Sequence, residues 1–273
     1  MTELISVVVS TYERPDALGA VVRGLSRQSD GNFEVVIADD GSGVATATVI
    51  AEWKAKLGVP LAHCRHEHAG FRAAEIRNRA IMASKGSYCI FLDGDCIPRP
   101  DFIARHRALA EPGWFVAGNR ILLSEALTAH VLAQKLEPEQ WSLASLVSRR
   151  GINRIAPALY VPLGPLRKAE PKRWEGARTC NLAVARADLD RVDGFDASYS
   201  GWGLEDSDLA IRLIHAGVRR RDGRFATGVF HLWHRENDRT SLSANQARLD
   251  EVMRGDRVRA LRGLSTLGVP VHA

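Results

Sequence analysis

The strongest constraint on the fold is a pattern repeated through the first 120 residues, in which a short apolar run ends in a polar turn. Three such stretches read LISVVVSTYERP, FEVVIADDGS and YCIFLDGDC. Runs rich in valine and isoleucine are typical of strands that are buried on both faces of a parallel sheet. Because ligands bind beyond the carboxyl ends of such strands, the three polar turns are expected to form one edge of a site.

Segments with a helical period separate these runs. Helices are expected over residues 14–29, 44–57, 72–84 and 101–110, and further strands over residues 61–67 and 114–122. In the first helix, apolar residues such as Leu18, Val22 and Leu25 recur at the spacing of one helix face. The resulting β-α-β-α order predicts an α/β fold, with a mostly parallel central sheet and helices on both faces.

The pattern loosens after Ser124. Helices are expected over residues 125–136 and 139–150, whereas residues 148–178 are rich in proline, arginine and lysine and predict a mobile or surface-seeking loop. A charged helix is expected after Ser243. A basic segment of this kind can face nucleic acid, an anionic membrane or a phosphate-bearing substrate, and a solvated face is an equal alternative.

Composition places the chain among ordinary globular proteins. Its 273 residues are 45% hydrophobic and 25% charged, with a net charge of +5, and this length can bury a large core. The N-terminal stretch lacks the regions of a signal peptide, and no apolar run approaches the ~18 residues of a spanning helix, so neither is expected. The four cysteines form no C-x-x-C pair, which predicts reduced thiols in a cytosolic protein.

The turn after the first strand, residues 10–15, argues against a nicotinamide cofactor, because it lacks the G-x-G-x-x-G of a dinucleotide-binding fold. Its hydroxyls, aromatic ring and guanidinium suit a base, a ribose or a phosphate instead. The second turn, Asp39 to Ser42, offers carboxylates that can accept hydrogen bonds from a ring N–H or a ribose hydroxyl. Asp-Gly is also common turn chemistry, so both interpretations stay open.

Two groups of metal-ligating residues follow strand-like runs. Asp93 and Asp95 flank Gly94, and two carboxylates so close together need a cation or water between them. This turn predicts a site for a divalent cation. His231 and His234 would lie on opposite faces of a strand, whereas a turn could bring both to a metal, and a structural role is the alternative.

The stretch GWGLEDSDLAIRL, residues 201–213, places three carboxylates within four positions beside a tryptophan. Acids stabilise a helix N-terminus by ~0.3–1 kcal/mol each, so capping is one explanation. If a helix begins here, Asp206 alone shares the inward face of the apolar residues three and four positions later, where a partly apolar setting can tune it as a general base. Asp208 stands four residues before Arg212, which predicts an exposed ion pair.

Taken in order, these motifs resemble the family 2 type of inverting, nucleotide-sugar-dependent glycosyltransferases with the metal-dependent GT-A fold. The resemblance covers Ile5 to about Asn237. In the first half it is carried by VVVSTYERPDAL, FEVVIADDGS, FRAAEIRNRAI and GSYCIFLDGDC. In the second half, VDGFDASYSGWGLEDSDLAIRL is similar to the galactosyltransferase C-terminal region of β-1,4-galactosyltransferases, polypeptide N-acetylgalactosaminyltransferases and bacterial chondroitin polymerases.

The resemblance implies that residues 1–120 form a nucleotide-sugar-binding half. In this half, Ser10, Tyr12 and Arg14 would line the nucleotide pocket. Asp40 would contact the base, expected to be uracil, and Arg72 matches a nucleotide-contacting arginine.

The resemblance also implies a metal centre. Asp95 and His234 would hold Mn²⁺ or Mg²⁺, with Asp93 beside the ribose or the donor sugar. His231 stands where some galactosyltransferases carry a second, weaker ligand, so its role as a ligand stays open.

Residues 121–240 would form the acceptor-binding and catalytic half of the same domain, followed by a helical tail over residues 241–273. Trp202 and Glu205 would hold the acceptor or donor sugar, and Asp206 would be the catalytic base. The departures from the family pattern are the basic residues 148–178 and the lack of a transmembrane anchor. They favour a bacterial-type cytoplasmic enzyme, with peripheral contact at the inner face of an anionic membrane as a further expectation.

The implied activity is transfer of a hexose or N-acetylhexosamine from a UDP-sugar to a hydroxyl of a glycan, lipid-linked or other glycoconjugate acceptor. The expected sugars are galactose, GalNAc and GlcNAc, and the anomeric configuration would invert in one displacement. Two alternatives are a catalytically silent nucleotide-sugar-binding protein and a nucleotidyltransferase, which should carry a glycine-rich basic first loop. Silent relatives should lack the base or a ligand, yet Asp95, Asp206 and His234 are present. No nucleic-acid partner is expected.

Overall fold

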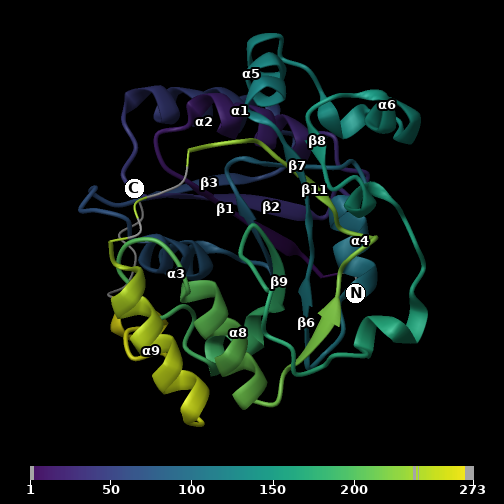
Figure 1. Cartoon of the computed structure of the whole chain (residues 1–273). Coiled ribbons are helices and arrows are strands. Elements are labelled where there is room, and N and C mark those ends of the chain that lie inside the picture. The colour runs from purple at the N-terminus through teal and green to yellow at the C-terminus, as the bar shows by residue number, and fades with distance from the viewer. Residues whose placement is uncertain (1–2, 236–237, 239, 268–273) are drawn as a thin grey trace.

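The computed structural model describes residues 3–235, 238 and 240–267 and is built around a seven-stranded sheet (Figure 1). The strand order is β10-β6-β9-β4-β1-β2-β3. Neighbouring strands are parallel except at β9, which runs antiparallel to β4 and β6. The strands are β1 (Ile5–Thr11), β2 (Phe33–Asp39), β3 (Leu61–Arg65), β4 (Tyr88–Asp93), β6 (Trp114–Ala117), β9 (Asn181–Ala185) and β10 (Arg219–Asp222). The predicted mostly parallel α/β sheet is therefore confirmed.

Two apolar layers cover the two faces of this sheet. Every residue of β2 is buried, and Val8 of β1 lies beside Val36 of β2 and Phe91 of β4. Because side chains alternate along a strand, Val7 and Val9 belong to one layer and Val8 belongs to the other. Burial of apolar surface, worth roughly 25 cal/mol per Å², is the main term that stabilises such a domain.

Helices complete both layers, as the sequence predicts. One layer contains α1 (Pro15–Leu25), α2 (Val44–Lys56), α4 (Phe102–Leu109) and α5 (Glu125–Ala133), and the other contains α3 (Ala73–Ala83), α7 (Arg186–Arg191) and α8 (Glu205–His215). In α1, Pro15 occupies the first turn, where its missing N–H costs no hydrogen bond. The C-terminal helix α9 (Leu242–Arg254) packs beside α8 (Figure 1).

The strand expected over residues 114–122 is wrong, because two strands in two different sheets occupy this stretch. The second sheet has the order β5-β11-β7-β8, with strands β5 (Cys96–Pro98), β7 (Arg120–Leu123), β8 (Ile152–Asn153) and β11 (Val229–His231). The chain leaves β6 at Gly118, where a Cβ atom would lie 2.3 Å from side-chain atoms of Asn181. Gly118 also donates its N–H to the Asn181 backbone oxygen at 2.8 Å. A close backbone approach, which leaves no mark on sequence periodicity, therefore ends the strand.

The helix expected over residues 139–150 is interrupted. The 3₁₀ turn η1 (Pro138–Gln140) precedes α6 (Leu143–Ser148), which begins where the Ser142 hydroxyl accepts the N–H of Ser145. Of the helical tail expected over residues 241–273, α9 and the 3₁₀ turn η4 (Leu264–Thr266) are helical, residues 255–263 are not, and residues 268–273 lie outside the described part of the chain. Within the described residues, none of the helices has the length and apolar character needed to cross a bilayer.

The basic segment, residues 148–178, is anchored to the domain at Arg167, which argues against the mobile loop that was one of its two expected forms. The Arg167 guanidinium is buried and donates to the backbone oxygens of Val161, Asp222 and Arg224 at 2.7–3.0 Å. The segment contains β8 and two 3₁₀ turns, η2 (Ala156–Ala158) and η3 (Gly164–Lys168). A single arginine thus satisfies three carbonyl groups and ties this segment to the chain around β10.

Candidate active site

A cavity of about 1030 Å³ opens where the carboxyl ends of β1, β2 and β4 meet. The start of α8 and the end of β11 complete its walls. Of the residues that the sequence singles out, all except Arg72 line this cavity: Ser10, Tyr12, Arg14, Asp40, Asp93, Asp95, Trp202, Glu205, Asp206, His231 and His234. The fold therefore gathers motifs from both ends of the chain into one site.

Tyr12 and Asp40 belong to the part of the cavity wall that follows β1 and β2, and both contact histidines in the loop after β3. The ring of Tyr12 stacks on His68, with 4.4 Å between the ring centroids and 13° between the planes. The Asp40 carboxylate accepts a hydrogen bond from His66. Gly41 has φ +91°, and a Cβ atom there would lie 2.5 Å from the backbone nitrogen of His68, so only glycine fits this turn.

Arg72 is not among the residues that line this cavity, so the nucleotide contact expected for it stays a prediction. Its guanidinium pairs with Glu75 at 3.2 Å, and its backbone N–H donates to Asp40 at 2.9 Å. Arg72 therefore helps to fix Asp40 in the site.

A further cation that lines the cavity is Arg77, which sequence reasoning did not identify. Its guanidinium is buried and donates to Ser10 Oγ at 3.0 Å, to Glu205 Oε1 at 2.9 Å and to Asp93 Oδ1 at 3.3 Å. A signal was available in the sequence, because Arg77 is flanked at three and four positions by buried apolar residues of α3. An arginine on an apolar helix face needs buried partners, and here these come from two other elements.

The acidic turn after β4 passes close to β1. Gly94 donates its N–H to the Ser10 backbone oxygen at 2.7 Å, and a Cβ atom there would lie 2.8 Å from that oxygen. Asp95 thereby reaches the end of β11, where its carboxylate oxygens lie 3.7 Å from Nε2 of His231 and 3.5 Å from Nε2 of His234. Because β11 ends at His231, a turn brings the two imidazoles to the same carboxylate.

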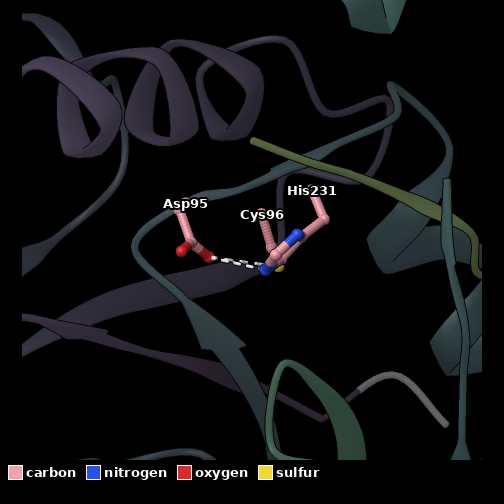
Figure 2. A group of neighbouring side chains, drawn as sticks. All are labelled: Asp95, Cys96 and His231. Carbon is pink, nitrogen blue, oxygen red and sulfur yellow. Dashed lines mark hydrogen bonds and ion pairs between the residues drawn. The ribbon is translucent and has the colours of Figure 1, made fainter. Parts of the chain in front are cut away.

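This group of side chains fits a divalent cation. Burial is the largest influence on His231 and lowers its pKa to about 4, so the ring is neutral near pH 7 and can donate a lone pair to a metal. Cys96, which the sequence interpretation did not consider here, places its thiol within 4.8 Å of ligand atoms of Asp95 and His231 (Figure 2). Burial raises the pKa of the Cys96 thiol, so the carboxylate and the imidazoles are the better ligands.

The start of α8 brings Glu205 and Asp206 to the cavity. Glu205 is buried against Arg77, whereas Asp206 accepts the N–H of Ser207 at 2.7 Å and opens onto the cavity. Burial and the neighbouring Glu205 carboxylate raise the pKa of Asp206 to about 7, and Arg77 opposes this rise. A carboxyl group that titrates near neutrality is suited to accept a proton from a hydroxyl.

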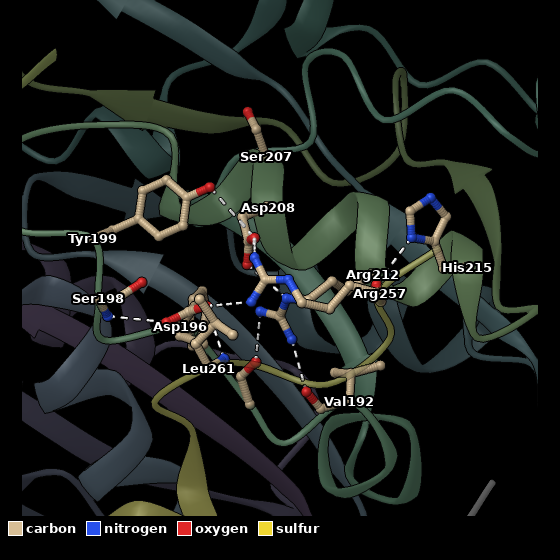
Figure 3. Close-up of polar contacts among 12 residues, drawn as sticks. Val192, Asp196, Ser198, Tyr199, Ser207, Asp208, Arg212, His215, Arg257 and Leu261 are labelled. Carbon is tan, nitrogen blue, oxygen red and sulfur yellow. Dashed lines mark hydrogen bonds and ion pairs between the residues drawn. The ribbon is translucent and has the colours of Figure 1, made fainter. Parts of the chain in front are cut away.

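Asp208 faces the protein interior, which corrects the expectation of an exposed ion pair. Asp208 and Arg212 are both fully buried, with 2.6 Å between Arg212 Nε and Asp208 Oδ2. The same guanidinium donates to the backbone oxygens of Val192 at 2.7 Å and Gly194 at 2.9 Å (Figure 3). The expectation that Asp206 alone points inward is therefore wrong. What distinguishes Asp206 is that it opens onto the cavity.

The fold and the cavity define a protein with the GT-A glycosyltransferase fold. A mannosyltransferase from Pyrobaculum calidifontis, solved in complex with GDP-Man and Mn²⁺, matches with a TM-score of 0.60 and 17% identity, over 93% of this chain and 65% of that one. Residues 1–349 of S. aureus TarS match with a TM-score of 0.60 and 14% identity, over 91% of this chain and 65% of that one. At these identities the likeness shows the fold alone.

The chain belongs to glycosyl transferase family 2, whose model matches residues 6–151. A second model, the N-terminal domain of galactosyltransferase, matches residues 167–235. Validoxylamine A glucosyltransferase of Streptomyces hygroscopicus subsp. jinggangensis is 29% identical over 241 residues, which are 83% of this chain and 55% of that protein. Chondroitin synthase of Escherichia coli is 23% identical over 235 residues, which are 78% of this chain and 32% of that protein. The chain thus spans about half or less of the length of these relatives.

We expect Asp208→Ala to lower the free energy of unfolding by about 3–5 kcal/mol, because it leaves the buried Arg212 guanidinium without its carboxylate. Asp250→Ala is a matched control, since its partner Arg254 is exposed and 3.9 Å away, and it should change stability by only about 0.5 kcal/mol. Urea denaturation followed by tryptophan fluorescence measures both variants. Equally small effects would contradict a buried anchor at Asp208.

Proposed function

We propose that this chain is an inverting glycosyltransferase that moves galactose, GalNAc, GlcNAc or a related hexose from a UDP-sugar to a hydroxyl of a glycan or glycoconjugate. The observation that carries the proposal is a single cavity that joins Asp95, His231 and His234 to Asp206. The names of relatives agree with it, since they include a glucosyltransferase, a hyaluronan synthase and chondroitin synthases. TarS of S. aureus has also been solved in complex with UDP.

In this proposal residues 1–120 form the donor half and residues 121–240 form the acceptor half. Ser10, Tyr12 and Arg14 hold the nucleotide, and Asp40 meets the base, because these side chains share the wall after β1 and β2. Within the tail expected over residues 241–273, α9 packs against α8 of the acceptor half.

The chemistry of the transfer follows from the carboxylates. Asp206 takes the proton as the acceptor hydroxyl attacks the anomeric carbon from the face opposite UDP, so the configuration inverts without a covalent enzyme intermediate. Glu205 and Asp93 are both paired with Arg77. Asp206 has no such pair among the described residues, and burial and the Glu205 carboxylate raise its pKa to about 7. Trp202 offers an apolar face for a sugar ring.

A divalent cation would complete the donor site. Asp95 and His234 would hold it with His231 as a further ligand, and a bound Mn²⁺ or Mg²⁺ would neutralise the charge of the departing diphosphate. Two imidazole nitrogens suit the softer Mn²⁺ better than Mg²⁺, which prefers oxygen ligands.

One screen distinguishes the proposal from its alternatives. Nucleotide sugars are incubated with the protein, Mn²⁺ and candidate acceptors, and separate reactions contain nucleoside triphosphates and sugar phosphates. Release of UDP from a nucleotide sugar supports glycosyl transfer. Binding of a nucleotide sugar without release indicates a silent binding protein, and release of pyrophosphate indicates a nucleotidyltransferase.

We expect UDP binding to require a divalent cation and to be tighter with Mn²⁺ than with Mg²⁺. Asp95→Ala and His234→Ala should each weaken Mn²⁺-dependent UDP binding by more than about tenfold, because each removes a ligand. Calorimetry with Mn²⁺, Mg²⁺ and a chelator measures this effect, and His130→Ala, at an exposed position of α5, is the control. Equal UDP affinity in Mn²⁺ and in chelator would rule out the metal site.

We expect Asp206→Asn to lower kcat by ~10²–10⁴-fold, because an amide cannot accept the proton. UDP affinity should stay near that of the wild type, since the base meets the acceptor. The rate of the wild-type enzyme should fall as the pH drops below about 7, where a rising fraction of Asp206 is protonated.

Steady-state kinetics across pH measures both effects. Glu205→Gln should weaken sugar binding and, because it removes a carboxylate that raises the pKa of Asp206, should also move the pH profile to lower pH. Near-normal kcat in Asp206→Asn, together with an inactive but folded Asp208→Asn, would move the base to Asp208.

The proposal includes peripheral contact with an anionic membrane, where a lipid-linked acceptor would be met. Leu143 and Val147 of α6 are 47% and 66% exposed, and exposed Arg149 and Arg150 follow them. Apolar side chains beside arginines suit the headgroup region of anionic lipids.

We expect the protein to cosediment with phosphatidylserine-containing liposomes at low salt and to be released at high salt. A double variant, Arg149→Glu with Arg150→Glu, should lose this binding through charge reversal. Arg254→Glu, on α9 and distant from α6, should retain it (Figure 1). Absence of wild-type binding at low salt would remove the membrane from the proposal.

A further inference from the structure

The turn that carries Trp202 is held by a side chain from the C-terminal helix α9. Asn245 is 1% exposed, and its Nδ2 donates to the backbone oxygens of Ser200 and Gly203, each at 3.1 Å. A side-chain amide nitrogen carries two hydrogens. Here one reaches the carbonyl of Ser200, which precedes Trp202 in the sequence, and the other reaches the carbonyl of Gly203, which follows it. One buried side chain therefore spans the whole turn.

The conformation of this turn depends on such outside contacts. Gly201, Gly203 and Leu204 have φ values of +70°, +102° and +78°, a left-handed region that is costly for leucine. Gly201 donates its N–H to Phe71 O at 3.2 Å, and a Cβ atom on Gly201 would lie 2.5 Å from Ser241 Oγ. The turn is thus shaped by its close contact with the start of α9.

The same C-terminal segment also fixes the helix that carries the proposed base. Arg257 donates to Asp196 Oδ2 at 2.7 Å and to Asp208 Oδ1 at 3.3 Å (Figure 3). Asp208 is the buried anchor of α8 described above. Residues 241–257 therefore hold both the turn and α8, and they lie beyond the stretches matched by the two family models.

We propose that Asn245 is a positioning residue for glycosyl transfer, which sets the direction of Trp202 and so places the acceptor sugar relative to Asp206. This inference rests on the proposed function. A sugar ring stacks on an indole only where the indole face is held in place, and small misplacements of a reacting hydroxyl slow its attack. The proposed UDP contacts belong to the turns after β1 and β2, so donor affinity should not depend on Asn245.

Hydrogen exchange tests the positioning directly, without any substrate. In Asn245→Ala, deuterium uptake at the Gly201 amide, which donates to Phe71 O, should become roughly tenfold faster than in the wild type. The reason is that the turn opens more often once two of its carbonyls lose the Asn245 side chain. Gln246→Ala, an exposed change on the same helix, should leave this uptake unchanged. Unchanged uptake in Asn245→Ala would overturn the proposal.

Kinetics test the consequence for transfer. With the donor and acceptor found by the screen, Asn245→Ala should lower kcat/KM for the acceptor by roughly 10–100-fold, while calorimetric UDP–Mn²⁺ affinity stays unchanged. If Asn245→Ala shows faster amide exchange in the turn but a wild-type kcat/KM for the acceptor, the proposal is also overturned. If Asn245→Ala does not fold, Asn245→Ser, which keeps a polar group in the buried position, takes its place in both measurements.

The two proposals can fail separately. A wild-type protein that releases no UDP from any nucleotide sugar contradicts the proposed function, and the exchange measurement still decides whether Asn245 holds the turn. Normal transfer in Asn245→Ala leaves the enzyme assignment intact and removes only the role of Asn245.

Discussion

The buried guanidinium of Arg77 is the group on which the arrangement of the site depends. It joins the end of β1 at Ser10, the acidic turn at Asp93 and the start of α8 at Glu205. Without a cation between them, the two carboxylates would face each other in a poorly solvated cavity, where their charged forms are costly. Arg77 offsets part of this cost, although burial still raises the pKa of Asp93, and it links the first half of the chain to the second. The pKa of Asp206 nevertheless rises to about 7, since burial and Glu205 outweigh Arg77 there.

The crowding of acids at the start of α8 has a geometric explanation. Residues two positions apart on an α-helix point about 200° away from each other. Asp208 can therefore enter the core and pair with Arg212, while Asp206 opens onto the cavity. One carboxylate anchors the helix and the other lines the cavity. Arg257 extends the anchor to the C-terminal segment, so the direction of Asp206 is set by contacts on the far side of the helix.

Local patterns predicted most of the first half of the fold, because valine-rich strands, helical spacing and Gly-Asp turns are all encoded within a few residues. The features that the sequence could not show depend on distant partners. Arg77 and Glu205 are 128 positions apart, and the strand broken at Gly118 reflects an approach to Asn181. The acidic turn and the two histidines were predictable as types of ligand, and the resemblance implied that Asp95 and one of these histidines share a metal. The geometry that brings both histidines to Asp95 depends on the pairing of β5 with β11, which local patterns do not show.

The account rests on one carboxylate base that acts in a single displacement, and the stereochemistry of the product tests this most directly. Proton NMR can read the anomeric signal of the sugar transferred from an α-linked UDP-sugar, because a glycosidic bond keeps its configuration in solution. The account predicts a β-linked product, since the acceptor hydroxyl activated by Asp206 attacks from the face opposite UDP. An α-linked product would contradict it, because retention requires a second displacement or attack from the same face.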